Sequence, residues 1–204
     1  MIEKLHQWDV QLFVYLNSLG SETWDPVWEI ITKQVAWIPV FAIVIYLAFK
    51  RLGWKHALMV VGVVGLTVLF TDQTTNLVKN SVQRLRPGNN PEIATIVRAV
   101  IKRHSFSFFS GHAANSMAVA VLVYRVLHPY LKYIGFFFLW PLIFAYSRIY
   151  LGLHYPGDIL TGYIFGAFMG WLMSLLYAKL RDKYFPQHER LDNPTNSEPI
   201  TNRQ

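Results

Sequence analysis

Five long apolar runs occupy most of the sequence, and they restrict the possible folds more than any other feature. The runs cover residues 34–49, 57–78, 113–127, 133–147 and 159–178, and only Asp72 in the second and Arg125 in the third are charged. A helix that crosses a membrane needs about 20 mostly apolar residues, and about 17 can suffice. The fifth run has this length unaided, and the others reach it when Lys and Arg at their ends extend toward the headgroups. The sequence therefore predicts an all-α, polytopic membrane helix bundle with about five transmembrane helices.

The composition argues against a large soluble helical protein, which is the alternative interpretation of these runs. Hydrophobic residues make up 53% of the 204-residue chain and charged residues only 15%, against about 25% charged in an average soluble domain. Such a chain lacks the polar sequence that would cover five apolar helices in water. The absence of Cys excludes a disulfide scaffold, Cys-ligated zinc, iron–sulfur clusters and thiol catalysis.

We expect three regions along the chain. Residues 1–33 form helices at the membrane interface, because the first mixes apolar and polar residues as a surface-lying amphipathic helix does. In the second of these helices Asp25 is expected as the N-cap, with Pro26 in the first turn. Residues 34–182 form the transmembrane core, and the polar residues 183–204 are expected to be a disordered tail.

The alternation of five spans sorts the loops to two ends of the bundle. One end carries residues 79–112 and 148–158, and the other carries residues 50–55, 125–132 and the segment after 179. The two ends hold equal numbers of Lys and Arg, but at the second end the loops are short and the charges adjoin the spans. The positive-inside bias operates on such loops, so we expect the second end in the cytoplasm and the first end on the opposite side.

The net charge of +7 suits an anionic partner, such as nucleic acid, a membrane surface or a phosphorylated substrate. Because the basic residues are divided between both ends and form no single patch, no nucleic-acid partner is expected. Three cations, Lys79, Arg86 and Arg148, belong to the first end. They would repel one another unless an anion lies among them, and guanidinium forks suit phosphate oxygens. The alternative is that each cation only contacts lipid headgroups.

Two further segments at the first end contain histidine. Ser110-Gly111-His112 directly precedes the third run. Ser can cap the helix there, Gly lets a ligand approach the backbone, and the free N–H groups of a helix start attract anions. His154 and Asp158 flank the start of the last run, where the carboxylate can reach back to the imidazole. A carboxylate on one ring nitrogen fixes the tautomer and makes the other nitrogen a better nucleophile. An ordinary helix cap beside an interfacial His is the alternative.

These three segments together resemble a known family. The pattern Lys79-x6-Arg86-Pro87, then Ser110-Gly111-His112, then Ser147-Arg148-x5-His154-x3-Asp158 is similar to the three-part signature of the type 2 phosphatidic acid phosphatase superfamily. These are membrane lipid phosphatases related to the vanadium haloperoxidases. One position departs from the pattern, because Phe109 stands where the family usually has proline. Proline would stiffen the turn but carries no chemistry, so the departure concerns geometry more than activity.

The resemblance implies a role for each residue of the signature. His154 would attack phosphorus and form a phosphohistidine, and Asp158 would orient it. His112 would protonate the leaving oxygen and then activate water. The phosphoryl oxygens would be held by Lys79, Arg86, Ser110, the Gly111 amide and Arg148.

No metal ion and no other cofactor is expected, since the carboxylates Asp72, Glu92 and Asp158 are too scattered for a cation cage. Asp72 itself is interpreted as a partner for a buried polar group or as a residue that positions the site.

The expected partners are a lipid phosphate substrate and membrane lipids, and the oligomeric state stays open. Candidate substrates are undecaprenyl diphosphate, phosphatidic acid, phosphatidylglycerol phosphate and lipid A phosphate. The short N-terminal region resembles bacterial undecaprenyl-diphosphate phosphatases of the superfamily, which is a similarity of architecture only. A lipid phosphotransferase, a haloperoxidase and a non-catalytic membrane protein are the alternatives, and five spans argue against the haloperoxidase. The expected location is a bacterial inner membrane, with the site on the extracytoplasmic face.

Overall fold

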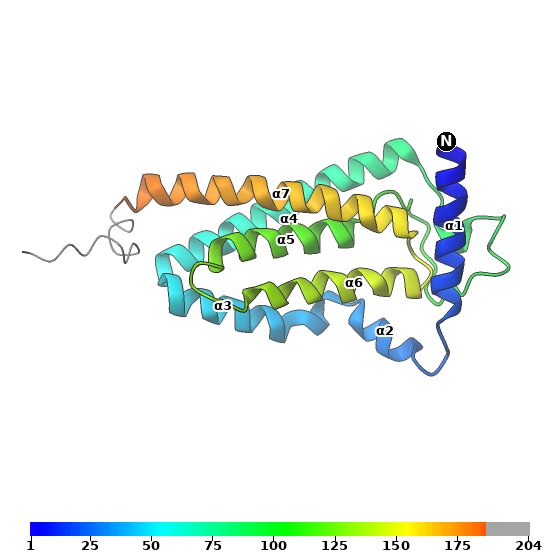
Figure 1. Ribbon diagram of the computed structural model, residues 1–204, viewed down its shortest axis with the longest axis horizontal. Coiled ribbons are helices and arrows are strands. Elements are labelled where there is room, and N and C mark those ends of the chain that lie inside the picture. Colours follow the sequence, from blue (N-terminus) through cyan, green and yellow to red (C-terminus); the bar gives the residue numbers. More distant parts are fainter. Residues whose placement is uncertain (187–204) are drawn as a thin grey trace, which may run out of the picture.

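The computed structural model describes residues 1–186, and within them the chain is helical without any strand. The five apolar runs form the helices α3 to α7, which lie side by side in one elongated bundle (Figure 1). The prediction of an all-α bundle is confirmed. In chain order the helices are α1 (Ile2–Ser18), α2 (Asp25–Ile31), α3 (Ile38–Leu52), α4 (Trp54–Val82), α5 (Gly111–Leu127), α6 (Leu139–Tyr150) and α7 (Pro156–Tyr184), joined by the 3-10 turns η1 (Gln34–Trp37), η2 (Pro87–Asn89) and η3 (Ile134–Phe138).

Three segments of the described chain are long and apolar enough to cross a membrane: Gln34–Leu52, Trp54–Asn89 and Pro156–Tyr184. The segment Ile134–Tyr150 is apolar but shorter. Helix α5 has 17 residues, and most of its side chains are buried because it packs against α4, α6 and α7. It is therefore the centre of the bundle, and the other helices shield it from lipid.

The contact between α5 and α7 is close because α7 presents glycine at every fourth position. A Cβ atom on Gly162, Gly166 or Gly170 would collide with the backbone carbonyl oxygens of α5, those of Ser110, Ala114 and Ala118. Small residues on one helix face let two membrane helices approach backbone to backbone. As a result the start of α7 lies directly beside the start of α5, where the Ser110 amide donates to the Asp158 carbonyl at 3.0 Å.

The end of α4 directs the following segment back toward α5 and α7. Helix α4 stops at Gln83, whose φ of 53° places it in the left-handed conformation. Beyond it Arg84 and Leu85 lead to Arg86, which is extended with φ −71° and ψ 154°, as is usual for a residue before proline. Ser107 fixes this segment, because its amide donates to the Arg84 carbonyl at 2.8 Å.

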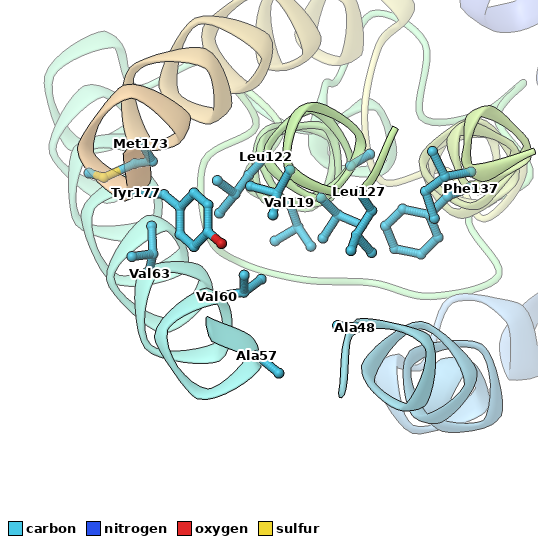
Figure 2. Close-up of a cluster of buried hydrophobic side chains, with 14 of the residues drawn as sticks. Ala48, Ala57, Val60, Val63, Val119, Leu122, Leu127, Phe137, Met173 and Tyr177 are labelled. Atoms are coloured by element: carbon cyan, nitrogen blue, oxygen red, sulfur yellow. The ribbon is translucent and has the colours of Figure 1, made fainter. Parts of the chain in front are cut away.

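The apolar core fills the part of the bundle away from these loops. Figure 2 shows side chains from several helices meeting there, among them Val60 and Val63 of α4, Leu122 of α5, Phe137 of η3 and Tyr177 of α7. Buried Thr67 and Thr75 of α4 satisfy their hydroxyls by donating to carbonyls one turn earlier, at 2.7 Å each.

Helix α1 lies across the end of the bundle at which α4 finishes and α5 and α7 begin (Figure 1). Its buried face carries Phe13 and Asn17, and the Asn17 amide donates to the carbonyls of Ile149 at 3.1 Å and Tyr150 at 2.9 Å. The exposed side carries a row of large apolar residues, Leu5, Trp8, Leu12, Tyr15 and Leu19. The sequence predicted a helix in this segment, and its place at the membrane interface stays a prediction.

The expected N-cap role of Asp25 is wrong. Helix α2 begins at Asp25 itself, Trp24 is the N-cap, and no side chain caps the helix. The Asp25 carboxylate instead accepts from Arg98 at 3.0 Å and from the Tyr150 hydroxyl at 2.9 Å, so an ion pair to a distant segment has replaced the local hydrogen bond.

At the other terminus α7 continues to Tyr184, and residues 187–204 of the expected tail lie outside the described part of the chain.

Candidate active site

The three signature segments converge at the end of the bundle that α1 covers. Lys79, Arg86, Gly111, His112 and Arg148 all line one cavity of about 580 Å³. The remaining predicted residues, Ser110, His154 and Asp158, stand behind its wall and are 0–1% exposed. The structure thus brings together all eight residues that the sequence singled out, five facing the cavity and three supporting it.

His154 lies in the turn between α6 and α7, and its two ring nitrogens face opposite kinds of charge. Nδ1 is 3.4 Å from Asp158 Oδ2, and Nε2 is 3.1 Å from Nη1 of Arg86. Because a guanidinium can only donate, Nε2 must present its lone pair to Arg86, and the ring proton belongs on Nδ1 beside the carboxylate. The ring nitrogen that carries the lone pair is therefore the one turned toward Arg86.

Burial of His154, reinforced by the positive charges of Arg86, Arg148 and Lys79, holds the pKa of its imidazole well below the usual range. The ring is accordingly neutral at pH 7, so Nε2 carries a lone pair rather than a proton.

Arg86 is fixed by the backbone around it. Its Nε donates to the Ser105 carbonyl at 2.7 Å, and Nη1 donates to the Leu153 carbonyl at 2.8 Å. Nη2 donates to the Ser105 hydroxyl at 3.0 Å. These contacts hold the guanidinium between the loop before α5 and the turn that carries His154, so both segments depend on this one side chain.

Arg148 is the most buried cation of the cavity, with 2% of its surface exposed. One of its terminal nitrogens donates to the hydroxyl of Thr32, which lies between α2 and η1. Its Nε is buried and has no hydrogen-bond partner within residues 1–186. A buried donor without a partner is costly, and an anionic oxygen in the cavity would satisfy it. Thr32 was not predicted, since nothing local connects it to a residue 116 positions away.

The start of α5 supplies the remaining groups. The Ser110 hydroxyl caps the helix by accepting from the Ala113 amide at 3.4 Å, as the sequence predicted. The next amides, on Gly111 and His112, belong to the first turn, where backbone N–H groups lack helical partners. The His112 ring packs against Phe144, with the ring centres 5.3 Å apart, and lines the same cavity as the cations. Arg103 adds a fourth cation to the lining.

Asp158 is held by a chain of ion pairs that sequence reasoning missed. Its Oδ1 accepts from Arg84 at 2.7 Å, while its Oδ2 accepts from the Tyr155 amide at 3.0 Å. The other arm of Arg84 donates to Asp9 of α1 at 2.7 Å, and Asp9 also accepts from the Gly157 amide at 2.6 Å. Arg84 therefore clamps the carboxylate beside His154 and ties α1 to the start of α7.

The sequence held one signal for Arg84. It lies two residues before Arg86, which directly precedes Pro87, so an extended segment could turn both guanidiniums toward the same end of the bundle. Nothing pointed to Asp9, which is 75 residues away. Arg84 also stacks over the Tyr155 ring, 3.8 Å from its centre, which fixes its plane as well as its charge.

Beyond the cations the cavity becomes apolar. Its walls along α4 and α5 include Val68, Val64 and Val119, and Phe41 and Val44 of α3 close the side. A pocket with cations at one end and hydrocarbon walls at the other fits an amphiphile with an anionic head. Within residues 1–186 no group of three or more His, Asp or Glu side chains could hold a metal ion.

Comparison with known proteins agrees with this geometry. The model of the PAP2 superfamily matches residues 54–182. A lipid A 4'-phosphatase of Bacteroides thetaiotaomicron is 40% identical over 186 residues, covering 88% of this chain and 81% of the relative. A lipid A 4'-phosphatase of Porphyromonas gingivalis is 27% identical, covering 85% and 74% of the two chains. The solved transmembrane PAP2-type phosphatidylglycerolphosphate phosphatase of Bacillus subtilis superposes with a TM-score of 0.65 at 21% identity, covering 87% and 88%. At that identity the superposition shows a shared fold.

The clamp on Asp158 makes a stability prediction. Arg84→Gln leaves a buried carboxylate without its cation, so the free energy of unfolding should fall by about 3 kcal/mol. Thermal and denaturant unfolding in detergent would measure the change. Arg98→Gln is the matched control, because Arg98 pairs with Asp25 at a partly exposed position and should cost no more than about 1 kcal/mol. Equal effects of the two variants, or a loss that persists undiminished in an Asp158→Asn background, would contradict the clamp.

Proposed function

The chain belongs to the PAP2 superfamily and is an integral membrane lipid phosphatase, and from this premise we propose that it hydrolyses the phosphate monoester of a lipid A-type glycolipid. The reaction runs through a phosphohistidine on His154 and uses no metal ion. The observation that carries the proposal is the orientation of the His154 ring, with Nε2 toward Arg86 and Nδ1 toward Asp158. A neutral imidazole held in this way is a nucleophile aimed at an anion site.

In the first step the Nε2 lone pair attacks phosphorus. A P–N bond forms while the bond from phosphorus to the lipid oxygen breaks, and His112 gives that oxygen a proton. Asp158 keeps the proton on Nδ1 and stabilises the positive charge that develops on the ring. In the second step water attacks phosphorus and gives a proton to His112, the P–N bond breaks, and its electron pair returns to Nε2. The products are the dephosphorylated lipid and inorganic phosphate.

The cations supply the electrostatic part of the catalysis. Charge spreads over the three equatorial oxygens of the transferring phosphoryl group, and fixed positive groups stabilise it. Lys79, Arg86 and Arg148 line the cavity beside His154, and the unpaired Nε of Arg148 is a donor for one oxygen. Three side-chain cations provide the charge compensation that a divalent ion gives in metal-dependent phosphatases. Asp158 is committed to Arg84 and His154 rather than to a cation site.

The choice of lipid rests on two supports. The 40% identical relative is a lipid A 4'-phosphatase, and the similarity extends over most of both chains. The cavity also joins the cationic pocket to an apolar space between α3, α4 and α5, as a phosphate on a lipid requires. Undecaprenyl diphosphate, phosphatidic acid and phosphatidylglycerol phosphate would meet the same cations, so they are the comparison substrates.

We place the protein in a bacterial inner membrane with the site on the extracytoplasmic face. The support is the charge at the opposite end, where short loops place Lys50, Arg51, Lys55 and Lys132 next to the helices.

This orientation can be tested because the chain has no Cys of its own. Single cysteines in place of the exposed residues Glu92 and Lys132 report the two ends separately. In intact cells a membrane-impermeant maleimide should label Glu92→Cys, while Lys132→Cys should react only after lysis. The reverse pattern would overturn the orientation, since both cysteines are accessible once the membrane is broken.

The intermediate provides the test of the mechanism. Rapid quenching of purified protein with radiolabelled lipid A phosphate in EDTA should trap a phosphorylated enzyme, and phosphate release should proceed at the rate seen without EDTA. His154→Gln should show neither phosphoenzyme nor release, because the nucleophile is gone. His128→Gln at the opposite end of the bundle is the matched control and should behave as wild type. Loss of activity in EDTA that zinc or magnesium restores, or label on a residue other than His154, would contradict the mechanism.

A further inference from the structure

Between the cations and the apolar part of the cavity lies a polar band that the chemistry does not use. It consists of Asp72 and Asn76 of α4 and Asn115 of α5, all of which line the cavity. Polar and ionisable residues within membrane-spanning helices are expensive and usually serve a function. Within residues 1–186 none of these three side chains forms a hydrogen bond with His154 or Arg86, so their role lies elsewhere.

The lining changes in the same order along both helices. On α4 it runs from Lys79 through Asn76 and Asp72 to Val68. On α5 it runs from His112 through Asn115 to Val119. Lys79 and Asp72 are seven residues apart, which is about 10 Å along a helix. An occupant with its phosphate at the cations therefore meets polar side chains over about 10 Å of the α4 wall before that wall becomes hydrocarbon.

Most of the free hydrogen-bonding capacity of the band is that of an acceptor: each of the two amide nitrogens keeps one N–H, while the Asp72 carboxylate and the amide oxygens keep several lone pairs. Asp72 Oδ2 accepts from Asn76 at 3.2 Å, and Oδ1 accepts from the Asn115 amide nitrogen at 3.5 Å. A carboxylate only accepts, so this contact orients Asn115 with its oxygen away from Asp72. Asn115 Oδ1 is buried and has no partner within residues 1–186. The Asp72 carboxylate has further lone pairs available, because it can accept about four hydrogen bonds.

We propose that Asp72 and Asn115 determine substrate specificity by accepting hydrogen bonds from hydroxyl or amide N–H groups next to the substrate phosphate. The proposal rests on the proposed function and deepens it, since it names the headgroup chemistry that the site selects. A phosphorylated amino sugar carries such donors at this distance from its phosphate. A phosphatidate offers ester oxygens there, which only accept, and a polyprenyl phosphate offers hydrocarbon. Each would leave the acceptors of the band unpaired, which penalises binding.

The test compares two lipids in wild-type and variant protein purified in detergent. The readout is the ratio of kcat/KM for lipid A to kcat/KM for phosphatidic acid. Because both lipids use the same phosphate site, any general effect on folding or on the cations cancels in the ratio. Asn115→Leu and Asp72→Leu should each lower it about tenfold, the effect of one lost hydrogen bond to a buried or charged group. Asp72→Asn, which keeps an acceptor oxygen, should recover part of the preference.

Gln73→Leu is the matched control, since Gln73 is the exposed neighbour of Asp72 on α4 and does not line the cavity. It should leave the ratio unchanged. An unchanged ratio in the Asn115 and Asp72 variants would overturn the proposal, and so would a wild-type preference for phosphatidic acid. Neither result would contradict the proposed phosphatase mechanism.

Binding separates this inference from the proposed function. If wild-type protein releases phosphate from neither lipid, the proposed function fails. The role of the polar band is then tested by comparing the Kd values for lipid A and phosphatidic acid. Wild type should then bind lipid A about tenfold more tightly than phosphatidic acid, and Asn115→Leu should abolish the difference. Equal binding of both lipids by wild type would overturn the role of the band.

Discussion

The buried carboxylate of Asp158 is the interaction on which the rest of the site depends. It is fully enclosed and accepts hydrogen bonds from the Tyr155 amide and the Arg84 guanidinium, and Nδ1 of His154 lies 3.4 Å from it. A buried charge is tolerable only when it is paired and hydrogen-bonded. The partners that satisfy it come from the start of α7, the segment after α4 and, through Asp9, from α1. Satisfying one charge thus fixes the relative positions of three segments and places a carboxylate beside Nδ1 of His154.

The close packing of α5 on α7 positions the groups at the start of α5, Ser110 and His112. The glycine stripe on α7 brings the start of α5 beside Asp158, where the Ser110 amide donates to the Asp158 carbonyl. His112 and the first amides of α5 therefore face the cavity from one side, while Arg86 and Arg148 face it from others. Backbone contact between α5 and α7 aligns the two helix starts, and the loops add side chains and the backbone carbonyls that hold Arg86.

The sequence predicted the helices and the signature residues because both depend on short-range patterns. Apolar length identified α3 to α7, and fixed spacing placed His154 within reach of Asp158. Sequence reasoning did not identify Asp9 with Arg84, Thr32 with Arg148, or Asn115 with Asp72 as partners. Each pair joins separate segments, and the packing of the bundle alone decides which segments meet. The same reason explains the mistaken cap at Asp25, whose carboxylate is used by Arg98 and Tyr150. Arg84 is the clearest example of a residue that short-range patterns could not identify. Its neighbour Arg86 belongs to the signature, but the contacts of Arg84 itself are all with segments distant in the sequence.

The central claim is that His154 Nε2 forms the bond to phosphorus while Asp158 and Arg84 hold the ring. A crystal structure of the protein with orthovanadate, a stable mimic of the transferring phosphoryl group, tests it most directly. Vanadium should be bonded to Nε2 of His154, with its equatorial oxygens facing Lys79, Arg86 and Arg148 and the Asp9–Arg84–Asp158 chain intact. Vanadate bonded to His112 or to Nδ1 of His154, or lodged away from the cations, would contradict the account.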